Sequence, residues 1–390
     1  MKRKICVVTS TRAEYGFLKP LLSEFKSNYN IQLELVVTGT HLEEIYGYTL
    51  DEILNDKIQP SALIKIIEND TPLGILGTMA NSIQRVGEEI QKLTPDIVVL
   101  LGDRYEIFAI ASAAVVLGIP IAHISGGDVT YGAYDDIFRH CLTKMSNLHF
   151  TSCEEYRNRV IQLGEQPDTV FSVGSLSLEN IKNLQLLSVS EINNCLGIDV
   201  ENTLLVTFHP ITMERATQNK QFEEVLRALS EQNRYDVLFT KANADTNASE
   251  LNTILEQYQK KLPKKIRAFA SLGTLKYLSV MKHCVCVLGN SSSGILEAPS
   301  FKVPTINIGT RQIGRIQANS VVNCKAEKTE ILNALDMISQ KKFRQILKNT
   351  VNPYEKSNTA RSIAEKICDY LEKPIKIKKF HDLNCERYEV

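Results

Sequence analysis

The segment DIVVLLGDRYEIFAIASAAVVLGIPIAHISGG (96–127) decides the fold class of this chain. It holds two short and nearly uninterrupted apolar runs, DIVVLLGD (96–103) and PIAHISGG (120–127), with a helical stretch that opens at LLGDRYEIFA (100–109). Continuous apolar strands that alternate with helices are typical of a parallel sheet covered on both faces. The segment therefore predicts a strand–helix–strand unit of an α/β protein.

The same pattern extends along the chain in two sets. Strands of the first half are predicted at KICVVTS (4–10), ELVVTG (34–39), LHFTSC (148–153) and TVFSVGS (169–175), with a helix at LKPLLSEFK (18–26). After an irregular polar stretch at 180–202, strands are predicted at TLLVTFHP (203–210), DVLFTKAN (236–243), IRAFAS (266–271), CVCVLGNSS (284–292) and PTINIG (304–309). Two successive sets predict two doubly wound, Rossmann-like domains that meet at a cleft.

The length of 390 residues also favours two domains. We expect an N-terminal domain over 1–180, with acidic residues at its strand ends, and a second domain over 181–355 that binds an anionic group. A C-terminal segment, 356–390, contains the amphipathic helix AEKICDYLE (364–372) and is expected to pack back on the first domain.

Charge and composition exclude several classes of protein. Lysine plus arginine equal aspartate plus glutamate at 45 each, so no net field recruits nucleic acid or an anionic membrane. No apolar stretch approaches the roughly 18 residues that span a bilayer, and the apolar run of MKRKICVVTS (1–10) is a strand rather than a signal peptide. Nine cysteines without a CxxC pair indicate neither zinc nor a redox motif, and fit a reducing cytoplasm.

Because open α/β sheets bind ligands beyond the carboxyl ends of their strands, polar residues at strand ends are the candidate site. Asp103 and Arg104 follow the strand of 96–103, where a carboxylate and a guanidinium suit a ligand with charged and hydroxyl groups. A helix cap at Asp103 and a solvated Arg104 are the structural alternative.

The segment HISGGDVTYGAYDDIFRH (123–140) adds an acidic cluster. Asp128, Asp135 and Asp136 lie in and after a glycine-containing loop, and crowded carboxylates raise one another's pKa, so one acts as base while another stays an acid. One of Asp135 and Asp136 is also a candidate N-cap of the helix that follows.

The second half offers an anion site and a histidine. In VLGNSSSGILEAP (287–299), the Ser291 and Ser292 hydroxyls and the backbone at a helix start suit an anion, and Glu297, about two turns in, suits a ribose diol; a serine-rich capping turn is the alternative. His209 ends the strand of TFHP (207–210), where it faces the cleft. The chain contains no GxGxxG and no GxxxxGK[ST] fingerprint.

Arginines at strand ends supply positive charge locally. Arg12 lies in TRAEYG (11–16), and Arg311 and Arg315 lie in NIGTRQIGR (307–315). Guanidinium groups pair well with phosphate oxygens. We expect Arg12, Arg104 and Arg311 to converge on the cleft.

Several of these strings, in this order, resemble one known family. TSTRAEYG, VTGTHLEEIYG, LLGDRYEIFA, GGDVTYGAYDDIFRHCLTKMS, VTFHP, LGNSSSGILEAPS and INIGTRQIGR together resemble the hydrolysing UDP-N-acetylglucosamine 2-epimerases, and within them the bacterial NeuC type of sialic acid biosynthesis. The resemblance covers about residues 4 to 370. It implies a GT-B fold, no cofactor and no metal, and conversion of UDP-N-acetylglucosamine and water to N-acetylmannosamine and UDP.

The resemblance also implies roles for individual residues. The family's catalytic groups fall on Asp103, Asp135 and His209, and its UDP contacts fall on Arg12, Arg104, Asn243, Ser291, Ser292, Glu297 and Arg311. This chain departs from the family at Ser125, where members with HIEGGE carry a catalytic glutamate. Asp128 matches the next acid of that string, and we assign the missing proton-transfer task to Asp128, with a water held by Ser125 as the alternative.

Three other functions compete with this one. A hydrolysing epimerase acting on UDP-N,N'-diacetylbacillosamine, in legionaminic acid biosynthesis, would use the same machinery. A GT-B glycosyltransferase would need an acceptor site and gives no reason for the acids of 128–136. A non-catalytic nucleotide-sugar sensor is the third alternative. The expected assembly is a homodimer or homotetramer in the cytoplasm.

Overall fold

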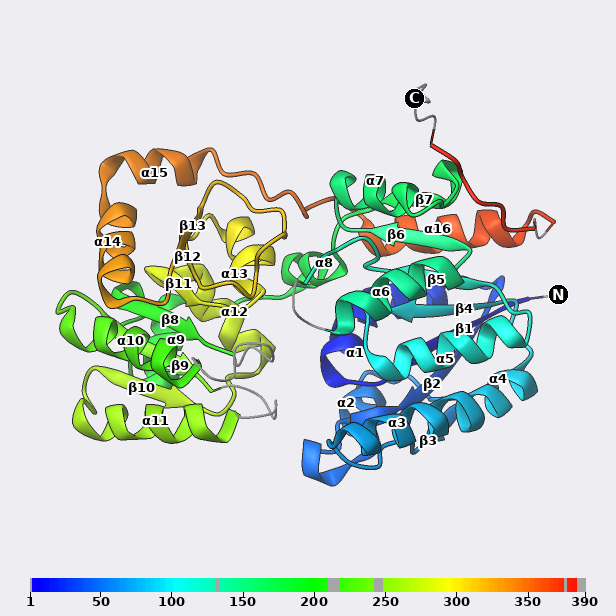
Figure 1. The fold of residues 1–390 in the computed structure, drawn as a ribbon, viewed down its shortest axis with the longest axis horizontal. Helices are drawn as coiled ribbons and strands as arrows, with labels where there is room; N and C mark the ends of the chain where they lie inside the picture. Colours follow the sequence, from blue (N-terminus) through cyan, green and yellow to red (C-terminus); the bar gives the residue numbers. More distant parts are fainter. Residues whose placement is uncertain (1, 131–133, 210–217, 242–247, 375–376, 384–390) are drawn as a thin grey trace, which may run out of the picture. The chain divides into compact units, whose positions relative to one another are not determined.

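The computed structural model describes residues 2–130, 134–209, 218–241, 248–374 and 377–383. The chain divides into two compact units, each an α/β layer structure (Figure 1). Unit 1 consists of Met1–Asp128, Tyr134–Asn180 and Lys356–Val390, and unit 2 of Val129–Ala133 and Ile181–Glu355.

Unit 1 is built on a seven-stranded parallel sheet with the strand order β3-β2-β1-β4-β5-β6-β7. Its strands are β1 (Arg3–Thr9), β2 (Ile31–Thr38), β3 (Ala62–Ile64), β4 (Ile97–Leu101), β5 (Ile121–Ile124), β6 (Leu148–Thr151) and β7 (Val170–Ser172). Its helices are α1 (Arg12–Ser27), α2 (Leu50–Asn55), α3 (Pro72–Asn81), α4 (Gly87–Leu93), α5 (Tyr105–Val116), α6 (Tyr134–Met145), α7 (Glu154–Gln162) and α16 (Thr359–Leu371), with α8 (Leu176–Asn183) running across the change to unit 2.

The apolar runs are continuous because both faces of the sheet are covered. On β1, Ile5 and Val7 belong to the core shared with α1 and α16, whereas Cys6 and Val8 belong to the core shared with α4 and α5. Successive side chains of a strand point to opposite faces, so the buried run Ile5, Cys6, Val7 and Val8 is apolar on both faces. Helix α16, from the far end of the chain, lies beside α1, against which it packs through residues such as Ile363.

Helix α1 contains a proline at its ninth residue, and unit 1 supplies the missing hydrogen bond. Pro20 has no N–H to donate to the carbonyl of Gly16, which a regular helix would require. The side-chain amide of Asn180, on α8, donates to that Gly16 carbonyl instead. The helix therefore continues to Ser27, and this hydrogen bond joins α8 to α1.

Unit 2 repeats the plan with a six-stranded parallel sheet in the order β10-β9-β8-β11-β12-β13. Its strands are β8 (Thr203–Thr207), β9 (Asp236–Thr240), β10 (Ile266–Phe269), β11 (Cys286–Gly289), β12 (Thr305–Ile308) and β13 (Val321–Cys324). Its helices are α9 (Val189–Leu196), α10 (Gln218–Glu231), α11 (Ala248–Lys261), α12 (Gly273–His283), α13 (Ser293–Leu296), α14 (Lys328–Ser339) and α15 (Lys341–Lys348). Leu204 and Val206 of β8 face one core and Leu205 the other.

The two parallel sheets confirm the predicted α/β class with two Rossmann-like units. Two strands escaped prediction, β3 and β13, and each is an edge strand of its sheet. Both are short and only partly buried, and Asn323 interrupts the apolar residues of β13. Among the helices that the structure describes, none is long and apolar enough to cross a membrane.

Candidate active site

The predicted acids of unit 1 lie where three adjacent strands end. β1, β4 and β5 are neighbours in the sheet, and Ser10, Asp103 and Ser125 follow them at the same edge. Gly102 turns the chain after β4 with a positive φ of 87°, a backbone conformation that glycine adopts at little cost. Parallel strands thus bring groups that are distant in sequence to one edge of the sheet.

Arg139 of α6 gathers the acids. Its side chain is 3% exposed, and one Nη donates to the Asp103 carboxylate while the other donates to Asp136 Oδ1 at 2.9 Å and to the Asp128 carbonyl at 2.9 Å. Burial alone would lower the Arg139 pKa, but the carboxylates of Asp103 and Asp128 raise it, so the guanidinium stays charged. Sequence reasoning missed Arg139, although its place four residues after Asp135 on one helix was a usable signal.

Asp135 carries the perturbed proton of this cluster. Burial, followed by repulsion from Asp103, raises its pKa from 3.8 to about 6. A pKa near neutrality suits a group that takes up and releases a proton.

The capping interpretations of these acids are wrong. Helix α5 begins at Tyr105 with Arg104 as its N-cap, without a side-chain cap, so Asp103 does not cap it. Asp135 and Asp136 lie inside the first turn of α6, not before it. Negative charge in a first turn is favourable with the helix dipole, which explains two acids there without a capping role.

His123 supports the turn that carries Asp103. Its imidazole, fully buried in β5, donates from Nε2 to the Gly102 carbonyl at 2.8 Å. Burial lowers the His123 pKa to about 3, so the ring is neutral at physiological pH. A neutral ring fixes the backbone beside Asp103 without adding charge to the site.

Ser125, where the resemblance leads us to expect a glutamate, has an unusual backbone conformation. Its φ is 71°, in the left-handed region that non-glycine residues seldom occupy, and its N–H donates to the Phe150 carbonyl at 2.8 Å. Such a conformation costs on the order of 1–3 kcal/mol and is often retained at functional sites. The neighbouring loop is tied to the acids through the Asp128 carbonyl and Arg139.

Two arginines lie at the same edge and bind carboxylates through Nε. Arg104 Nε is 2.6 Å from Glu106 Oε1, and Arg12 Nε is 2.6 Å from Glu52 Oε1. The Arg104 side chain is 39% exposed and that of Arg12 51%. Their contacts to a ligand, like those of the other predicted site residues, stay predictions.

In unit 2, Asn290 holds the predicted residues together. Its side-chain amide exchanges two hydrogen bonds with the His209 backbone, at 2.7 and 2.8 Å. Its backbone carbonyl accepts hydrogen bonds from Arg311 Nη1 at 3.0 Å and from Gln312 Nε2 at 2.9 Å. Asn290 is completely buried. It therefore fixes the end of β8 and the loop after β12 to the end of β11, a role that sequence reasoning missed.

The chain packs closely against the neighbouring strand where β11 ends. Gly289 has a φ of 131°, and a side chain there would collide with the Thr207 carbonyl. Helix α13 spans only four residues, with Ser292 as an N-cap that makes no side-chain cap bond, while the Ser291 hydroxyl accepts a long bond of 3.4 Å from the Ser293 N–H.

Glu297 ends this helix, so its prediction in the early turns of a longer helix is wrong. Pro299 explains the stop, because proline cannot continue an α-helix, and a 3₁₀ turn, Ala298–Phe301, follows. Burial raises the pKa of Glu297. Asn243, the remaining predicted contact, lies outside the described residues.

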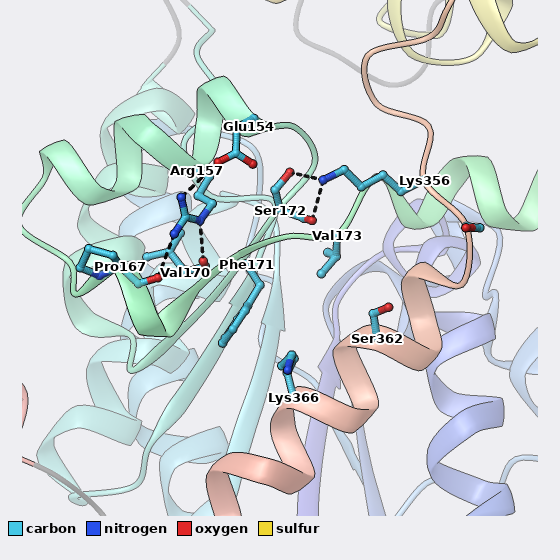
Figure 2. Close-up of a pocket in the computed structure, with 11 residues that line it drawn as sticks. Glu154, Arg157, Pro167, Val170, Phe171, Ser172, Val173, Lys356, Ser362 and Lys366 are labelled. Atoms are coloured by element: carbon cyan, nitrogen blue, oxygen red, sulfur yellow. Dashed lines mark hydrogen bonds and ion pairs between the residues drawn. The ribbon is translucent and has the colours of Figure 1, made fainter.

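A cavity of about 470 Å³ lies elsewhere on unit 1, at the edge strand β7 (Figure 2). Arg157 Nε donates to the Val170 carbonyl at 2.9 Å, and Lys356 Nζ donates to the Ser172 carbonyl and hydroxyl, each at 2.8 Å. These cations cap carbonyls of an edge strand and so discourage its pairing with another chain. The cavity lies at this sheet edge, and none of the residues that line it belongs to the acid cluster.

The donor groups that could ligate a metal are scattered. Within the described ranges, no group of three or more histidine, cysteine, aspartate and glutamate residues is arranged to hold a metal ion.

Solved structures define the class first. A UDP-GlcNAc 2-epimerase from Neisseria meningitidis, solved with UDP-GlcNAc bound, superimposes with a TM-score of 0.79 over 94% of this chain and 100% of that one, at 19% identity. A structure from Rickettsia bellii, described as UDP-N-acetylglucosamine 2-epimerase, matches with a TM-score of 0.75 over 95% of this chain and 98% of that one, at 20% identity. The fold is therefore GT-B-like, as the resemblance implied.

Sequence comparison then gives the family. The family model described as UDP-N-acetylglucosamine 2-epimerase matches residues 23–368, and the chain belongs to this enzyme family. It is 39% identical over 384 residues to the polysialic acid biosynthesis protein P7 of Escherichia coli, covering 98% of each chain. It is 38% identical over 345 residues to the GDP/UDP-N,N'-diacetylbacillosamine 2-epimerase (hydrolyzing) of Campylobacter jejuni, covering 88% of this chain and 89% of the relative. The resemblance drawn from the motifs is confirmed.

Proposed function

We propose that this protein is a hydrolysing UDP-N-acetylglucosamine 2-epimerase that converts UDP-N-acetylglucosamine and water to N-acetylmannosamine and UDP, for sialic acid biosynthesis. The observation that carries the proposal is the acid cluster around Arg139, which contacts the carboxylates of Asp103 and Asp136. In this cluster burial, and then repulsion from Asp103, raises the pKa of Asp135 to about 6. Two acids with separated proton affinities suit a reaction that removes one proton from carbon and returns another.

The first step is elimination of UDP. The hydrogen on sugar C2 is barely acidic, because its neighbour is an amide nitrogen and no carbonyl is alpha to it. Departure of UDP must therefore lead: the C1–O bond breaks, its electron pair leaves with the diphosphate, and positive charge develops at C1. A carboxylate then takes the C2 proton, the C1–C2 double bond forms, and the product is 2-acetamidoglucal.

The second step is addition of water. The water oxygen bonds to C1 and gives up a proton to a carboxylate, while C2 receives a proton on the face opposite to the one it lost. We assign these proton transfers to Asp103 and Asp135, with Asp128 as the third acid. A positioned acid or base contributes on the order of 10²–10⁴-fold to the rate.

Cationic and polar side chains would hold the UDP moiety. Arg12, Arg104 and Arg311 supply charge for the diphosphate, and His209 assists beside the diphosphate or the sugar. Asn243, Ser291, Ser292 and Glu297 complete the proposed UDP contacts. One preorganised donor to the departing diphosphate is worth about 3–4 kcal/mol in the transition state.

A second substrate is supported by a specific observation. The relative from Campylobacter jejuni, named for N,N'-diacetylbacillosamine, is as similar to this chain as the polysialic acid relative, at 38% against 39% identity. The same acids would act on UDP-N,N'-diacetylbacillosamine, and the difference would lie in the groups around sugar C4 and C6.

Incubation with each UDP-sugar in D₂O, followed by NMR, tests the reaction and the substrate together. Release of UDP and of a 2-epimerised sugar with deuterium at C2 is expected, with UDP-N-acetylglucosamine as the preferred substrate. Preference for the diacetylbacillosamine compound would favour the second candidate. An intact UDP-sugar in both cases would contradict the proposed activity and favour a sensor or a transferase without its acceptor.

Substitution Asp103→Asn tests the site. Turnover should be abolished while UDP affinity, measured by calorimetry, stays near that of the wild type, because the substitution removes a proton acceptor and not a diphosphate contact. Asp70→Asn, at an exposed position of the same unit, is the matched control. Near-normal turnover of Asp103→Asn would remove this acid from the mechanism. Light scattering checks the expected homodimer or homotetramer.

A further inference from the structure

Two buried glutamates that the proposed mechanism does not use meet at Ser10. The Ser10 hydroxyl oxygen lies 2.8 Å from Glu14 Oε2, on α1, and 2.9 Å from Glu106 Oε1, on α5. Glu14 is 6% exposed, and Ser10 and Glu106 are fully buried. Glu106 Oε1 also accepts from Arg104 Nε at 2.6 Å, so a chain of contacts links Glu14 to Arg104.

The number of protons available to Ser10, Glu14 and Glu106 decides which of the two carboxyl groups is protonated. The Ser10 hydroxyl has one proton and can donate it to only one of the two carboxyl groups. Glu14 Oε2 already accepts the Ser10 backbone N–H at 2.8 Å. For both contacts of the hydroxyl to be hydrogen bonds, one carboxyl group must carry a proton. Because Glu106 is paired with the Arg104 guanidinium, that proton belongs on Glu14.

The electrostatics agree with this assignment. Burial, followed by repulsion from Glu106, raises the pKa of Glu14 to about 7, against the lowering effect of Arg104 and Ser10. The groups that face Glu14 are thus Ser10 of the β1 end and Arg104 and Glu106 of the α5 segment. His41, beyond Thr9, has its pKa lowered to about 4 by burial and stays uncharged in this range.

We propose that Glu14, Ser10 and Glu106 are positioning residues for Arg104. They hold Arg104 by its Nε so that its two Nη groups face an anion. Glu14 is protonated in this arrangement. The proposal rests on the proposed function, in which Arg104 contacts the diphosphate. With Glu14 protonated, the charges of Glu106 and Arg104 cancel. When Glu14 loses its proton, the cluster gains one negative charge beside the ligand.

The consequence is a pH-dependent affinity with a defined sign. A bound anion disfavours ionisation of Glu14, so binding takes up a proton, and affinity falls as pH rises through about 7. If the anion raises the Glu14 pKa by about one unit, affinity falls up to about tenfold across the transition. The amide introduced by Glu14→Gln cannot ionise, so this variant should bind UDP with a flatter pH profile.

Calorimetric titration of the full chain with UDP between pH 6 and 8.5 is the test. Glu24→Gln, the same change on the same helix, is the control, and the wild-type to variant ratio cancels the titration of UDP itself and of Asp135. Ser10→Ala removes the hydroxyl that bridges Glu14 and Glu106, so the pH of its transition should differ from that of the wild type. Glu106→Gln should weaken UDP binding at every pH in the range.

The outcomes distinguish failure of the positioning role from failure of the diphosphate contact. If Arg104→Met binds UDP as the wild type does, the proposed diphosphate contact is wrong. If Arg104→Met weakens binding but folded Glu14→Gln and Ser10→Ala keep the wild-type pH profile, the positioning role is overturned. Circular dichroism and thermal unfolding establish which variants are folded, and Ser10→Ala keeps the test decisive if a glutamate variant is not.

Discussion

Removal of the Asp103 charge should lower the pKa of Asp135. That pKa is raised from 3.8 to about 6, with burial as the larger cause and Asp103 as the second. A change of this size corresponds to about 3 kcal/mol between the protonation states. Because burial is the larger cause, we expect Asp103→Asn to lower the Asp135 pKa by less than about one unit. Release of Arg139 from Asp103 acts in the same direction, since Arg139 lowers the pKa of Asp135.

Carbon NMR of protein labelled at aspartate carboxyl groups reports this titration directly, even in an inactive variant. Asp136→Asn is the matched control, because Asp136 also pairs with Arg139 but is not among the principal charges that shift Asp135. In the wild type, turnover should fall below about pH 6 if Asp135 acts as the base. A pKa of Asp135 that is unchanged or higher in Asp103→Asn would refute the electrostatic coupling.

Two further predictions concern the scaffold of the site. Lys378 Nζ contacts Glu165 Oε2 at 2.8 Å and donates to the Ser146 carbonyl, so Lys378→Met should lower the melting temperature relative to the neighbouring control Lys379→Met. Burial raises the Glu165 pKa, but His149 and the lysines Lys144 and Lys378 lower it more, from 4.5 to about 2. The stabilisation by ionised Glu165 is therefore present above pH 4.5 and is lost as pH falls towards 2. Asn180→Ala should cost about 1–3 kcal/mol by leaving the Gly16 carbonyl without its donor, and less in a Pro20→Ala background, where a backbone N–H is restored. Equal unfolding free-energy losses in both backgrounds would contradict that account.

The central strands of each sheet were the plainest to predict. KICVVTS and DIVVLLGD are recognisable because their apolar residues alternate between the cores on the two faces of the sheet. β3 and β13 are short, partly buried edge strands of three and four residues, and Asn323 interrupts the apolar residues of β13. The edge strands β7 and β10 were nevertheless predicted, within TVFSVGS and IRAFAS. The two strands that were missed pair along one side only, β3 with β2 and β13 with β12, and this pairing is not visible in the strand's own sequence.

The acids of the candidate site were predictable, and their supports were not. Asp103 follows a strand that is plain from the sequence, so its place at the sheet edge followed from topology. Arg139, Asn290 and Glu14 act through contacts between elements far apart in the chain, such as Arg139 with Asp103 and Asn290 with His209. Arg139 with Asp136 and Glu14 with Ser10 are short-range contacts that a local pattern can suggest. The long-range contacts depend on how helices and loops approach the sheet, and no local pattern encodes them.

The site also explains why arginine, and not lysine, occupies this sheet edge. Arg12 and Arg104 each give Nε to a carboxylate, and their Nη groups donate no hydrogen bond to the residues that the structure describes. A guanidinium has a planar fork of five N–H donors, so one side can be anchored while the other binds a second anion. A lysine ammonium is a compact point charge without such a fork, so a lysine turned toward Glu106 would present no second, oriented pair of donors to an anion. The formal charge of zero over the whole chain is therefore compatible with an anion site, because anchored guanidinium groups supply the attraction locally.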